Sequence, residues 1–189
     1  ILLRGESMMK GYWNLPDVTA ATIVDGWLHT GDIGKFDEQG SLMITDRKKD
    51  IIVNSGGDNI SPQRIEGLMT LETEISQAMV YGDDKPYLVA VLWPDEDFMR
   101  EFSRDNSLAN DIEELGQNED FRKIIRASID RVNKRLSTIE KVRSFMFAEA
   151  PFTIDNEMLT PSMKIRRHKI REAYSKQLDG LYQRKRKGQ

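Results

Sequence analysis

Hydrophobic side chains are distributed along this chain with two different periods, one typical of strands and one typical of helices. Continuous or alternating apolar runs that are rich in β-branched and aromatic residues predict strands. These strands are expected at residues 1–9, 78–83, 87–94 and 142–148. Because only a polar turn separates 78–83 from 87–94, we expect these two strands to be adjacent and to form the centre of a sheet.

Other segments repeat apolar side chains every three or four positions, which predicts helices. The helical period covers residues 61–72, 95–105, 119–137 and 166–182. Ser61 is a favourable N-cap and Pro62 suits a first helical turn, so both predict the start of the first helix. A short helical turn is also expected after Pro16, with Asp17 as its cap.

A domain boundary is expected near residue 47. Residues 32–46 form two alternating runs around a Glu-Gln-Gly turn, which is typical of a β-hairpin. The next positions, 46–50, carry five charges in a row, which a hinge tolerates better than a buried strand does. We therefore divide the chain into residues 1–47 and 48–189. The expected fold class is α+β, with a small central, mostly antiparallel sheet flanked by helices and preceded by the hairpin.

Composition limits the chemistry that the chain can carry. Its 189 residues, 39% of them hydrophobic, can bury one sizeable core, and a net charge of -3 does not favour nucleic acid as a partner. Cysteine is absent, so any thiol chemistry would use an external thiol, and a reducing compartment is consistent with this. His29 and His168 lack carboxylate or cysteine neighbours at ligand spacing, so we expect no metal site.

The sequence also bears on location. No apolar run approaches the roughly 20 residues that a membrane-spanning helix needs, and no signal sequence opens the chain. We therefore expect a cytoplasmic protein. The basic run at 184–187 would allow peripheral contact with an anionic membrane surface, although a solvated terminus explains it more simply. Nothing in the sequence indicates an oligomeric state.

Side chains suited to nucleotide chemistry are concentrated between residues 30 and 57. The Asp32 carboxylate can accept from a vicinal diol such as that of ribose, although Thr-Gly-Asp is also an ordinary turn sequence. Arg47 presents a planar guanidinium that can donate to ribose or phosphate oxygens. Gly56 and Gly57 allow a positive φ or the close approach of a ligand, and a tight turn would explain them equally well.

Two longer stretches resemble the linked motifs of the adenylate-forming superfamily, which includes acyl-CoA synthetases, luciferases and the adenylation domains of peptide synthetases. One is GWLHTGDIGKFDEQGSLMITDRKKDIIVNSGGDNISPQRIE at 26–66, and the other is LTPSMKIRR at 159–167. Residues 1–19 are similar to the later part of a motif in that superfamily's large N-terminal domain. We therefore expect a fragment that lacks most of such a domain. LSTIEKVRSF at 136–145 and Met163, where many relatives have glycine, are similar to the long-chain acyl-CoA synthetase branch.

The resemblance implies a role for each matching residue. Asp32 and Arg47 would bind the ribose of ATP, and Lys49 would be the hinge about which the C-terminal domain rotates. Lys164 would bridge the acyl carboxylate and the α-phosphate and stabilise the charge of the transition state. Without the resemblance, this residue would be interpreted as one solvated lysine among many. Glu66 would brace the neighbouring loop and helix.

Gly56 and Gly57 would contact the pantetheine arm of CoA or of a carrier protein. The implied protein uses ATP and Mg²⁺, the latter bound mainly by the N-terminal domain, to convert a long-chain fatty acid to its acyl-adenylate. It then transfers the acyl group to CoA. Residues 1–47 would be the tail of the large domain and 48–189 a mobile lid, inactive alone. Two alternatives remain: a ligase that loads a carrier protein, and a non-catalytic binding module that retains the lid fold. The sequence does not set the acyl chain length.

Overall fold

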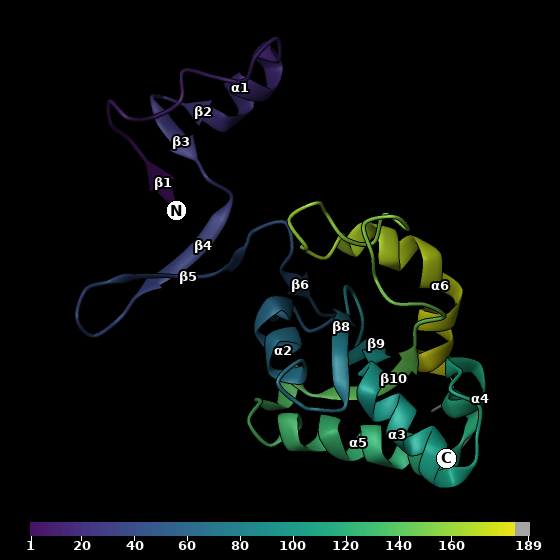
Figure 1. Ribbon diagram of the computed structural model, residues 1–189. Coiled ribbons are helices and arrows are strands. Elements are labelled where there is room, and N and C mark those ends of the chain that lie inside the picture. The colour runs from purple at the N-terminus through teal and green to yellow at the C-terminus, as the bar shows by residue number, and fades with distance from the viewer. Residues whose placement is uncertain (184–189) are drawn as a thin grey trace. The chain divides into compact units, whose positions relative to one another are not determined.

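The computed structural model describes residues 1–183 and divides the chain into two compact units, Ile1–Ile51 and Ile52–Gln189 (Figure 1). We call them unit 1 and unit 2, and each is described by itself. The division falls one residue after the charged segment 46–50 and four residues beyond the expected boundary at 47.

Unit 1 contains two small antiparallel sheets and one short helix. Its elements are β1 (Leu2–Leu3), α1 (Pro16–Thr22), β2 (Ile23–Val24), β3 (Trp27–His29), β4 (Asp32–Phe36) and β5 (Leu42–Arg47). The strands pair in the order β1-β3-β2 and as a β4-β5 hairpin. The Asp37 carboxylate closes this hairpin by accepting from the N–H groups of Gln39 and Ser41, at 2.9 and 2.8 Å. The predicted hairpin is therefore confirmed.

Two local expectations in unit 1 are wrong. The strand predicted at 1–9 is limited to Leu2–Leu3, because the chain turns at residues 5–8. The N-cap of α1 is Leu15 and not Asp17. Proline is favoured at the first helical position, so the helix begins at the proline and Asp17 falls inside its first turn.

Unit 2 consists of a three-stranded sheet, a small hairpin and helices. Its elements are β6 (Ile52–Val53), β7 (Asn59–Ile60), α2 (Pro62–Met69), β8 (Ile75–Tyr81), β9 (Leu88–Pro94), α3 (Glu96–Asn106), α4 (Ile112–Gln117), α5 (Glu119–Asn133), the 3-10 helix η1 (Thr138–Glu140), β10 (Val142–Phe147) and α6 (Arg167–Gln183). In the larger sheet β9 pairs antiparallel with β8 and parallel with β10, and β6 pairs antiparallel with β7. The predicted α+β class is confirmed, and its largest sheet is mixed.

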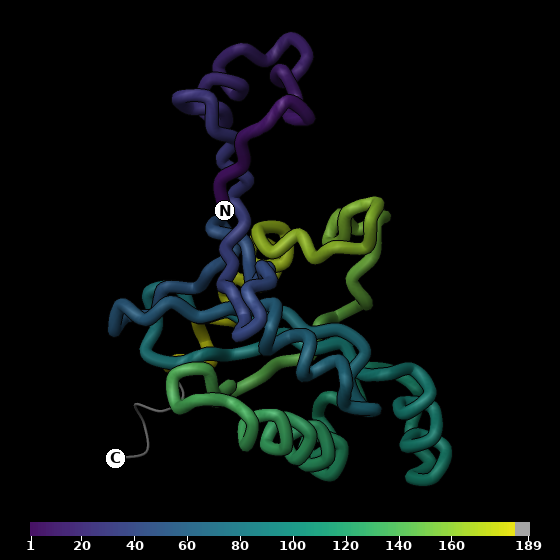
Figure 2. The backbone as a smooth tube through the Cα atoms, turned by 90° about the vertical axis from the view of Figure 1, so that its left-hand side faces the viewer, coloured from purple at the N-terminus to yellow at the C-terminus, as the bar shows by residue number. Residues whose placement is uncertain are grey.

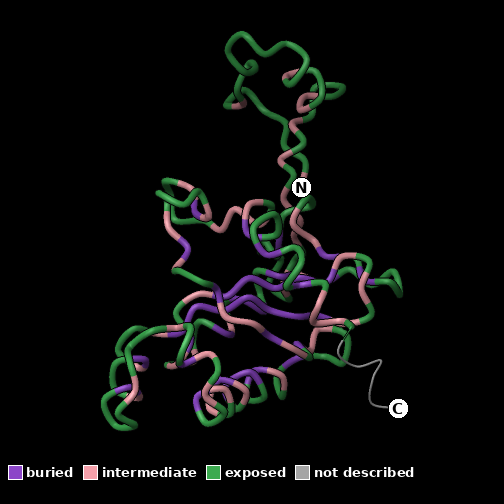
Figure 3. The backbone as a smooth tube through the Cα atoms, turned by 90° about the vertical axis from the view of Figure 1, so that its right-hand side faces the viewer, coloured by how far each residue is buried: buried purple, intermediate pink, exposed green. Residues whose placement is uncertain are grey.

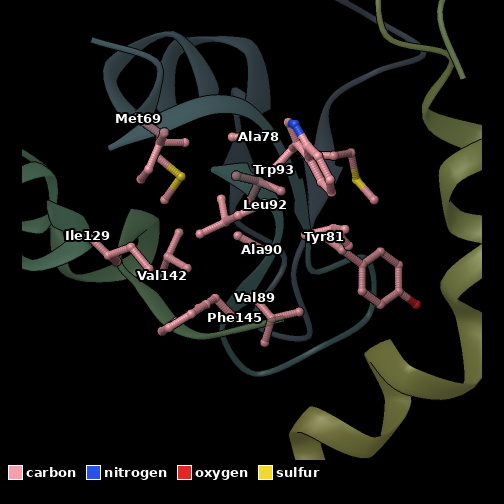
Figure 4. Packing of buried hydrophobic residues seen from close by; sticks show 14 of the residues in the cluster. Met69, Ala78, Tyr81, Val89, Ala90, Leu92, Trp93, Ile129, Val142 and Phe145 are labelled. Atoms are coloured by element: carbon pink, nitrogen blue, oxygen red, sulfur yellow. The ribbon is translucent and has the colours of Figure 1, made fainter. Parts of the chain in front are cut away.

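The core of unit 2 lies on both faces of this sheet. Every residue of the central strand β9 is buried. Helices α2 and α5 cover one face and α6 covers the other (Figures 1 and 4). In Figure 4, Met69 and Ile129 approach Leu92 from the first pair of helices, whereas Tyr81 points toward α6. Because both faces are covered, the central strand is a continuous apolar run, which is why the sequence predicted it well.

Burial differs sharply between the two units (Figure 3). Unit 2 contains the hydrophobic cluster, whereas Asp46 is the one buried residue of unit 1. Large apolar side chains of unit 1 are instead exposed, among them Trp13 at 90%, Phe36 at 73% and Ile44 at 66%. Unit 1 therefore has no hydrophobic core of its own.

The helices are present where the sequence predicted them: α3 and α6 are shifted by one residue, and α2 and α5 are shorter than expected. α2 ends at Met69 and α5 at Asn133, three and four residues before the expected ends at 72 and 137. α4 was not expected, because its six residues are too few to show a helical period. None of the helices in the described part of the chain is sufficiently long and apolar to cross a membrane. The basic run at 184–187 lies outside the described residues.

Candidate functional site

Asp32 and Arg47 face each other across the open end of the β4-β5 hairpin. They are paired in register, and Arg47 Nε donates to Asp32 Oδ1 at 2.9 Å. The Asp32 N–H donates to Thr30 Oγ1 at 3.0 Å, and Gly31 takes a φ of +74°, so a tight turn holds the carboxylate in place. The two side chains are 23% and 48% exposed. A diol can therefore approach the second carboxylate oxygen and the terminal guanidinium nitrogens.

Asp46 is an exception to the hinge expected for the charged segment 46–50, because it lies in strand β5 and is only 3% exposed. One carboxylate oxygen accepts from the Arg47 N–H at 2.7 Å, and the other has no hydrogen-bond partner in the described part of the chain. The strand pairing shifts between Ile33 and Gly34, opposite this point of β5. Asp46 thus fixes the backbone that carries Arg47.

The expected hinge residue, Lys49, lies in the turn that follows β5. The N–H groups of Asp50 and Ile51 donate to the Arg47 carbonyl oxygen at 2.9 and 3.2 Å, so Lys48 and Lys49 occupy the corner of this turn. Both lysines are exposed. A short turn with solvated side chains can change its backbone conformation without disturbing a core. The structure holds one conformation, so the hinge role stays a prediction.

Gly56 and Gly57 lie in the loop of the β6-β7 hairpin, which the buried Asn54 organises. Asn54 Oδ1 accepts from the N–H groups of Gly56 and Asp58, both at 2.9 Å, and Asn54 Nδ2 donates to Asp58 Oδ2 at 3.0 Å. Gly57 has a φ of +83°, as a glycine position predicts. A β-carbon on Gly56 would lie 3.2 Å from Asn54 Oδ1 and 3.3 Å from Asp58 Oδ2. Gly57 is therefore explained by its positive φ, and Gly56 by the close approach of two side-chain oxygens.

This loop is joined to the turn between β8 and β9 and, through that turn, to α6. The Ser55 N–H donates to the Lys85 carbonyl oxygen at 3.0 Å, and the Asp84 N–H donates to the Val53 carbonyl oxygen at 2.9 Å. Lys85 Nζ donates to Asp179 of α6 at 2.8 Å. The hydrogen bond to the Asp179 carboxylate raises the pKa of the Lys85 ammonium.

Lys164 lies in a tight loop that Leu159 and Ile165 close with an antiparallel bridge. Thr160 holds this loop from inside. Its N–H donates to the Lys164 carbonyl oxygen at 2.8 Å, and its Oγ1 accepts from the Lys164 N–H at 3.0 Å. The Lys164 side chain is exposed, and Figure 2 shows its yellow-green segment standing out from the sheet of unit 2. The backbone of the loop is therefore fixed while the ammonium remains accessible.

A second contact braces the segment that precedes this loop. Lys169 Nζ, in α6, donates to Glu157 Oε2 at 2.8 Å, and Arg166 Nη1 lies 3.9 Å from Glu157 Oε1. The Lys169 ammonium lowers the pKa of the Glu157 carboxyl, so this carboxylate stays ionised to a lower pH than a free one. The Arg166 N–H also donates to the Met158 carbonyl oxygen at 2.8 Å. The loop that carries Lys164 is thus attached to the start of α6 from both sides.

Met163 has a φ of +59°, a left-handed conformation that glycine adopts more readily than methionine. Its side chain is 67% exposed, so packing does not compensate for the backbone conformation. This geometry gives a physical reason for glycine at the matching position of the adenylate-forming motif.

Replacing Met163 with glycine is expected to stabilise unit 2 by up to about 1 kcal/mol, because the substitution removes the β-carbon from a left-handed residue. The measurement is denaturant unfolding of the 189-residue chain. Met163→Ala is the matched control, since it shortens the side chain but keeps the β-carbon, and it should leave the unfolding free energy unchanged. Equal stabilisation by both substitutions would show that the side chain, and not the backbone, is unfavourable.

Arg167 is a residue of this region that the sequence did not single out. Its Nη1 and Nη2 donate to Glu66 Oε1 and Oε2 at 2.7 and 2.9 Å, and Nη1 also donates to the Val80 carbonyl oxygen at 2.9 Å. Glu66 Oε1 in turn accepts from the Val80 N–H at 2.7 Å. The side chains are 19% and 8% exposed. Glu66 therefore braces α2, as expected. Its partners are in β8 and α6, which are too distant in sequence for the contact to be predicted.

The structure brings some of the predicted residues together within each unit. Asp32 and Arg47 form one pair in unit 1. Gly56 and Gly57 share one loop in unit 2, and Lys164 lies in another. Those two loops precede α2 and α6, the helices that the Glu66–Arg167 ion pair joins.

Known proteins are similar to this chain in sequence and in fold. Residues 49–186 match the family described as AMP-binding enzyme C-terminal domain. The chain is 36% identical over 186 residues to long-chain-fatty-acid–CoA ligase 1 of Cavia porcellus, covering 96% of this chain and 27% of that ligase. It is 35% identical over 184 residues to long-chain-fatty-acid–CoA ligase FadD15 of Mycobacterium tuberculosis, covering 96% of this chain and 31% of that protein.

A solved structure is similar as well. The crystal structure of the adenylation domain of a carboxylate reductase from Mycobacterium chelonae matches with a TM-score of 0.81 and 27% identity, over 94% of this chain and 26% of that one. The chain thus spans less than a third of the length of the curated ligases above. The sequence match and the fold together show that the chain belongs to the family of AMP-binding enzyme C-terminal domains.

Proposed function

We propose that this chain is the C-terminal part of an ATP-dependent ligase that activates a long-chain fatty acid as acyl-adenylate and then transfers the acyl group to CoA. The observation that carries the proposal is the Lys164 loop, whose backbone is held by hydrogen bonds while its ammonium is exposed. The similarity to long-chain-fatty-acid–CoA ligases supports the substrate class.

The first half-reaction needs charge stabilisation, which Lys164 would supply. A carboxylate oxygen of the fatty acid attacks the α-phosphorus of ATP, the bond to the β-phosphate oxygen breaks, and pyrophosphate leaves. Negative charge accumulates on the phosphoryl oxygens in the transition state, so an adjacent ammonium lowers the barrier. Because Lys164 is exposed on this chain, its desolvation would come from the site that it enters in the complete protein.

Asp32 and Arg47 would hold the nucleotide. Their ion pair uses Nε and one carboxylate oxygen, which leaves a carboxylate oxygen and two guanidinium nitrogens for the vicinal hydroxyls of ribose. Mg²⁺ would supply neutralisation of the triphosphate when bound. The described residues contain no group of three or more histidine, aspartate or glutamate side chains suited to hold it.

In the second half-reaction the CoA thiol gives its proton to solvent, its sulfur attacks the acyl carbonyl carbon, the carbon–oxygen bond to the phosphate breaks, and AMP leaves. The β6-β7 loop would lie beside the pantetheine arm, and Gly57 leaves open space where a side chain would otherwise stand. The proposal includes a rotation of unit 2 about Lys49 between the two half-reactions. It also includes a cytoplasmic location and, in addition, peripheral contact with a membrane surface.

The exposed apolar side chains of unit 1 support a larger parent protein. Trp13, Phe36 and Ile44 belong to a unit without a core, and apolar surface of this extent requires cover. In the proposed protein the large N-terminal domain covers them. The same domain would contain the acyl pocket and the ATP phosphate site.

The test is fatty-acid-dependent exchange of ATP with labelled pyrophosphate in the full-length protein that contains this chain, using acids from acetate to palmitate. Exchange that is strongest with long acids, followed by formation of acyl-CoA, is the expected result. Exchange without acyl-CoA, but with transfer to a carrier protein, would replace CoA by carrier-borne pantetheine. A folded protein that exchanges with no acid would contradict the proposal and favour a non-catalytic binding module.

A further inference from the structure

We propose that Arg167 is a positioning residue for Lys164, and that its ion pair with Glu66 sets where the Lys164 loop stands on unit 2. This inference rests on the proposed function, in which Lys164 carries adenylation. The structure shows Arg167 at the first position of α6, three residues after Lys164. Its guanidinium reaches across the edge of β8 to a helix on the opposite face of the sheet.

The Arg167–Glu66 contact fixes the orientation of the two side chains as well as the distance between them. Both terminal nitrogens of Arg167 donate to Glu66, one to each carboxylate oxygen. The same arginine donates to the Val80 carbonyl oxygen, and Glu66 accepts from the Val80 N–H. Three elements therefore meet in one hydrogen-bonded network at a single residue of an edge strand. Such a bidentate contact allows little rotation or sliding.

Stability alone is a weak explanation of this network. Burying two charges has a desolvation penalty, and apolar side chains of similar volume often stabilise a protein equally well. Leu159 and Ile170, on either side of the Lys164 loop, already anchor it to the core at 4% and 0% exposure. The network adds a fixed orientation for the first residue of α6, where the loop ends.

The consequence for catalysis follows from the short connection. Only Ile165 and Arg166 separate Lys164 from Arg167, so a displacement at the start of α6 passes to the lysine almost undiminished. A misplacement of about 1 Å in a catalytic group can slow a reaction about 100-fold. Arg167 would then affect adenylation, which uses Lys164, much more than thioester formation, which does not.

The experiment uses the full-length protein that contains this chain, with Arg167→Met and Arg167→Lys measured in both half-reactions. Pyrophosphate exchange reports adenylation, and acyl-CoA formed from supplied acyl-adenylate reports the second step. Arg167→Met should lower the maximal exchange rate about 10- to 100-fold and change the second step less than about 3-fold. Arg167→Lys, which retains the charge but loses the planar fork, should fall in between.

A double-mutant cycle separates positioning from a general structural role. If Arg167 acts through Lys164, adding Arg167→Met to Lys164→Ala should lower acyl-adenylate formation by less than about 2-fold further, followed over a long time course. Arg131→Met is the matched control, since it breaks the ion pairs of another arginine with Glu72 and Glu74, and it should leave exchange unchanged.

Three results would overturn the inference: equal losses in both half-reactions, an undiminished effect of Arg167→Met in the Lys164→Ala protein, or full exchange in Arg167→Met. Thermal unfolding of each variant shows whether it is folded. If Arg167→Met is unfolded, Arg167→Lys and Glu66→Gln provide the same comparison, because both retain hydrogen-bonding groups. A wild-type protein that exchanges with no acid would instead contradict the proposed function, so the two failures are distinguishable.

Discussion

Replacing Lys164 with alanine in the full-length protein is expected to lower fatty-acid-dependent pyrophosphate exchange by about 100- to 1,000-fold. Removing one group that stabilises transition-state charge typically has an effect of this size. The substitution should leave thioester formation from supplied acyl-adenylate close to the wild-type rate. The side chain is exposed and its loop is held by backbone hydrogen bonds and Thr160, so the alanine variant should fold normally.

The control for this substitution is Lys176→Ala, which removes another exposed lysine from unit 2 and should leave both half-reactions unchanged. Lys164→Arg tests geometry, because it retains the positive charge on a larger, planar group. An equal loss of both half-reactions in Lys164→Ala would refute the assignment of this residue to adenylation. Normal exchange would show that another cation performs the task.

The parts of the fold that sequence predicted best are those in which one physical rule dominates. The run at 87–94 is apolar throughout because β9 is covered on both faces. The β4-β5 hairpin has alternating strands and an aspartate that closes its turn. In α5 the buried side chains recur at helical spacing, as at Phe121, Ile125 and Ile129. Each of these patterns is local, so a single sequence reveals it.

Contacts between distant segments could not be predicted in the same way. The Glu66–Arg167 ion pair joins residues separated by 101 positions, and the arginine at the end of the Lys164 motif looks like any other in a chain with 28 basic residues. The parallel pairing of β10 with β9 depends on the path taken by α3, α4 and α5 between them. Asp46 belongs to a charged run that predicted a hinge, whereas its burial depends on strand pairing.

In the candidate site, too, local features could be predicted and contacts between distant segments could not. The glycine pair and the Lys164 loop were identified by motif, but the groups that shape them were not. Asn54, which organises the glycine loop, signals its role only through the Asn-x-Gly-Gly-Asp spacing, in which a short amide side chain can accept from N–H groups two and four residues later. Thr160 holds the Lys164 loop by similar local contacts. Such short-range contacts could have been predicted, unlike the ion pair between helices.

Replacing Lys49 with proline is expected to impair the second half-reaction and to spare the first. Lys48 and Lys49 form the corner of a turn closed by hydrogen bonds to the Arg47 carbonyl oxygen. Proline at the third position of such a turn is disfavoured, since it fixes its own φ and restricts the preceding residue. In the proposed cycle rotation follows adenylation, so a restricted hinge stops the enzyme after acyl-adenylate has formed.

Acyl-CoA formation from supplied acyl-adenylate should fall at least about 10-fold in Lys49→Pro, while pyrophosphate exchange should remain within about 3-fold of wild type. Lys49→Ala is the matched control: it removes the ammonium but leaves the backbone free, and it should retain both activities if the hinge acts through its backbone. A loss in Lys49→Ala equal to that in Lys49→Pro would assign the role to the side chain. Unchanged CoA transfer in Lys49→Pro would exclude residue 49 as the hinge, and a loss of exchange as well would show that the turn itself is required for the adenylating arrangement.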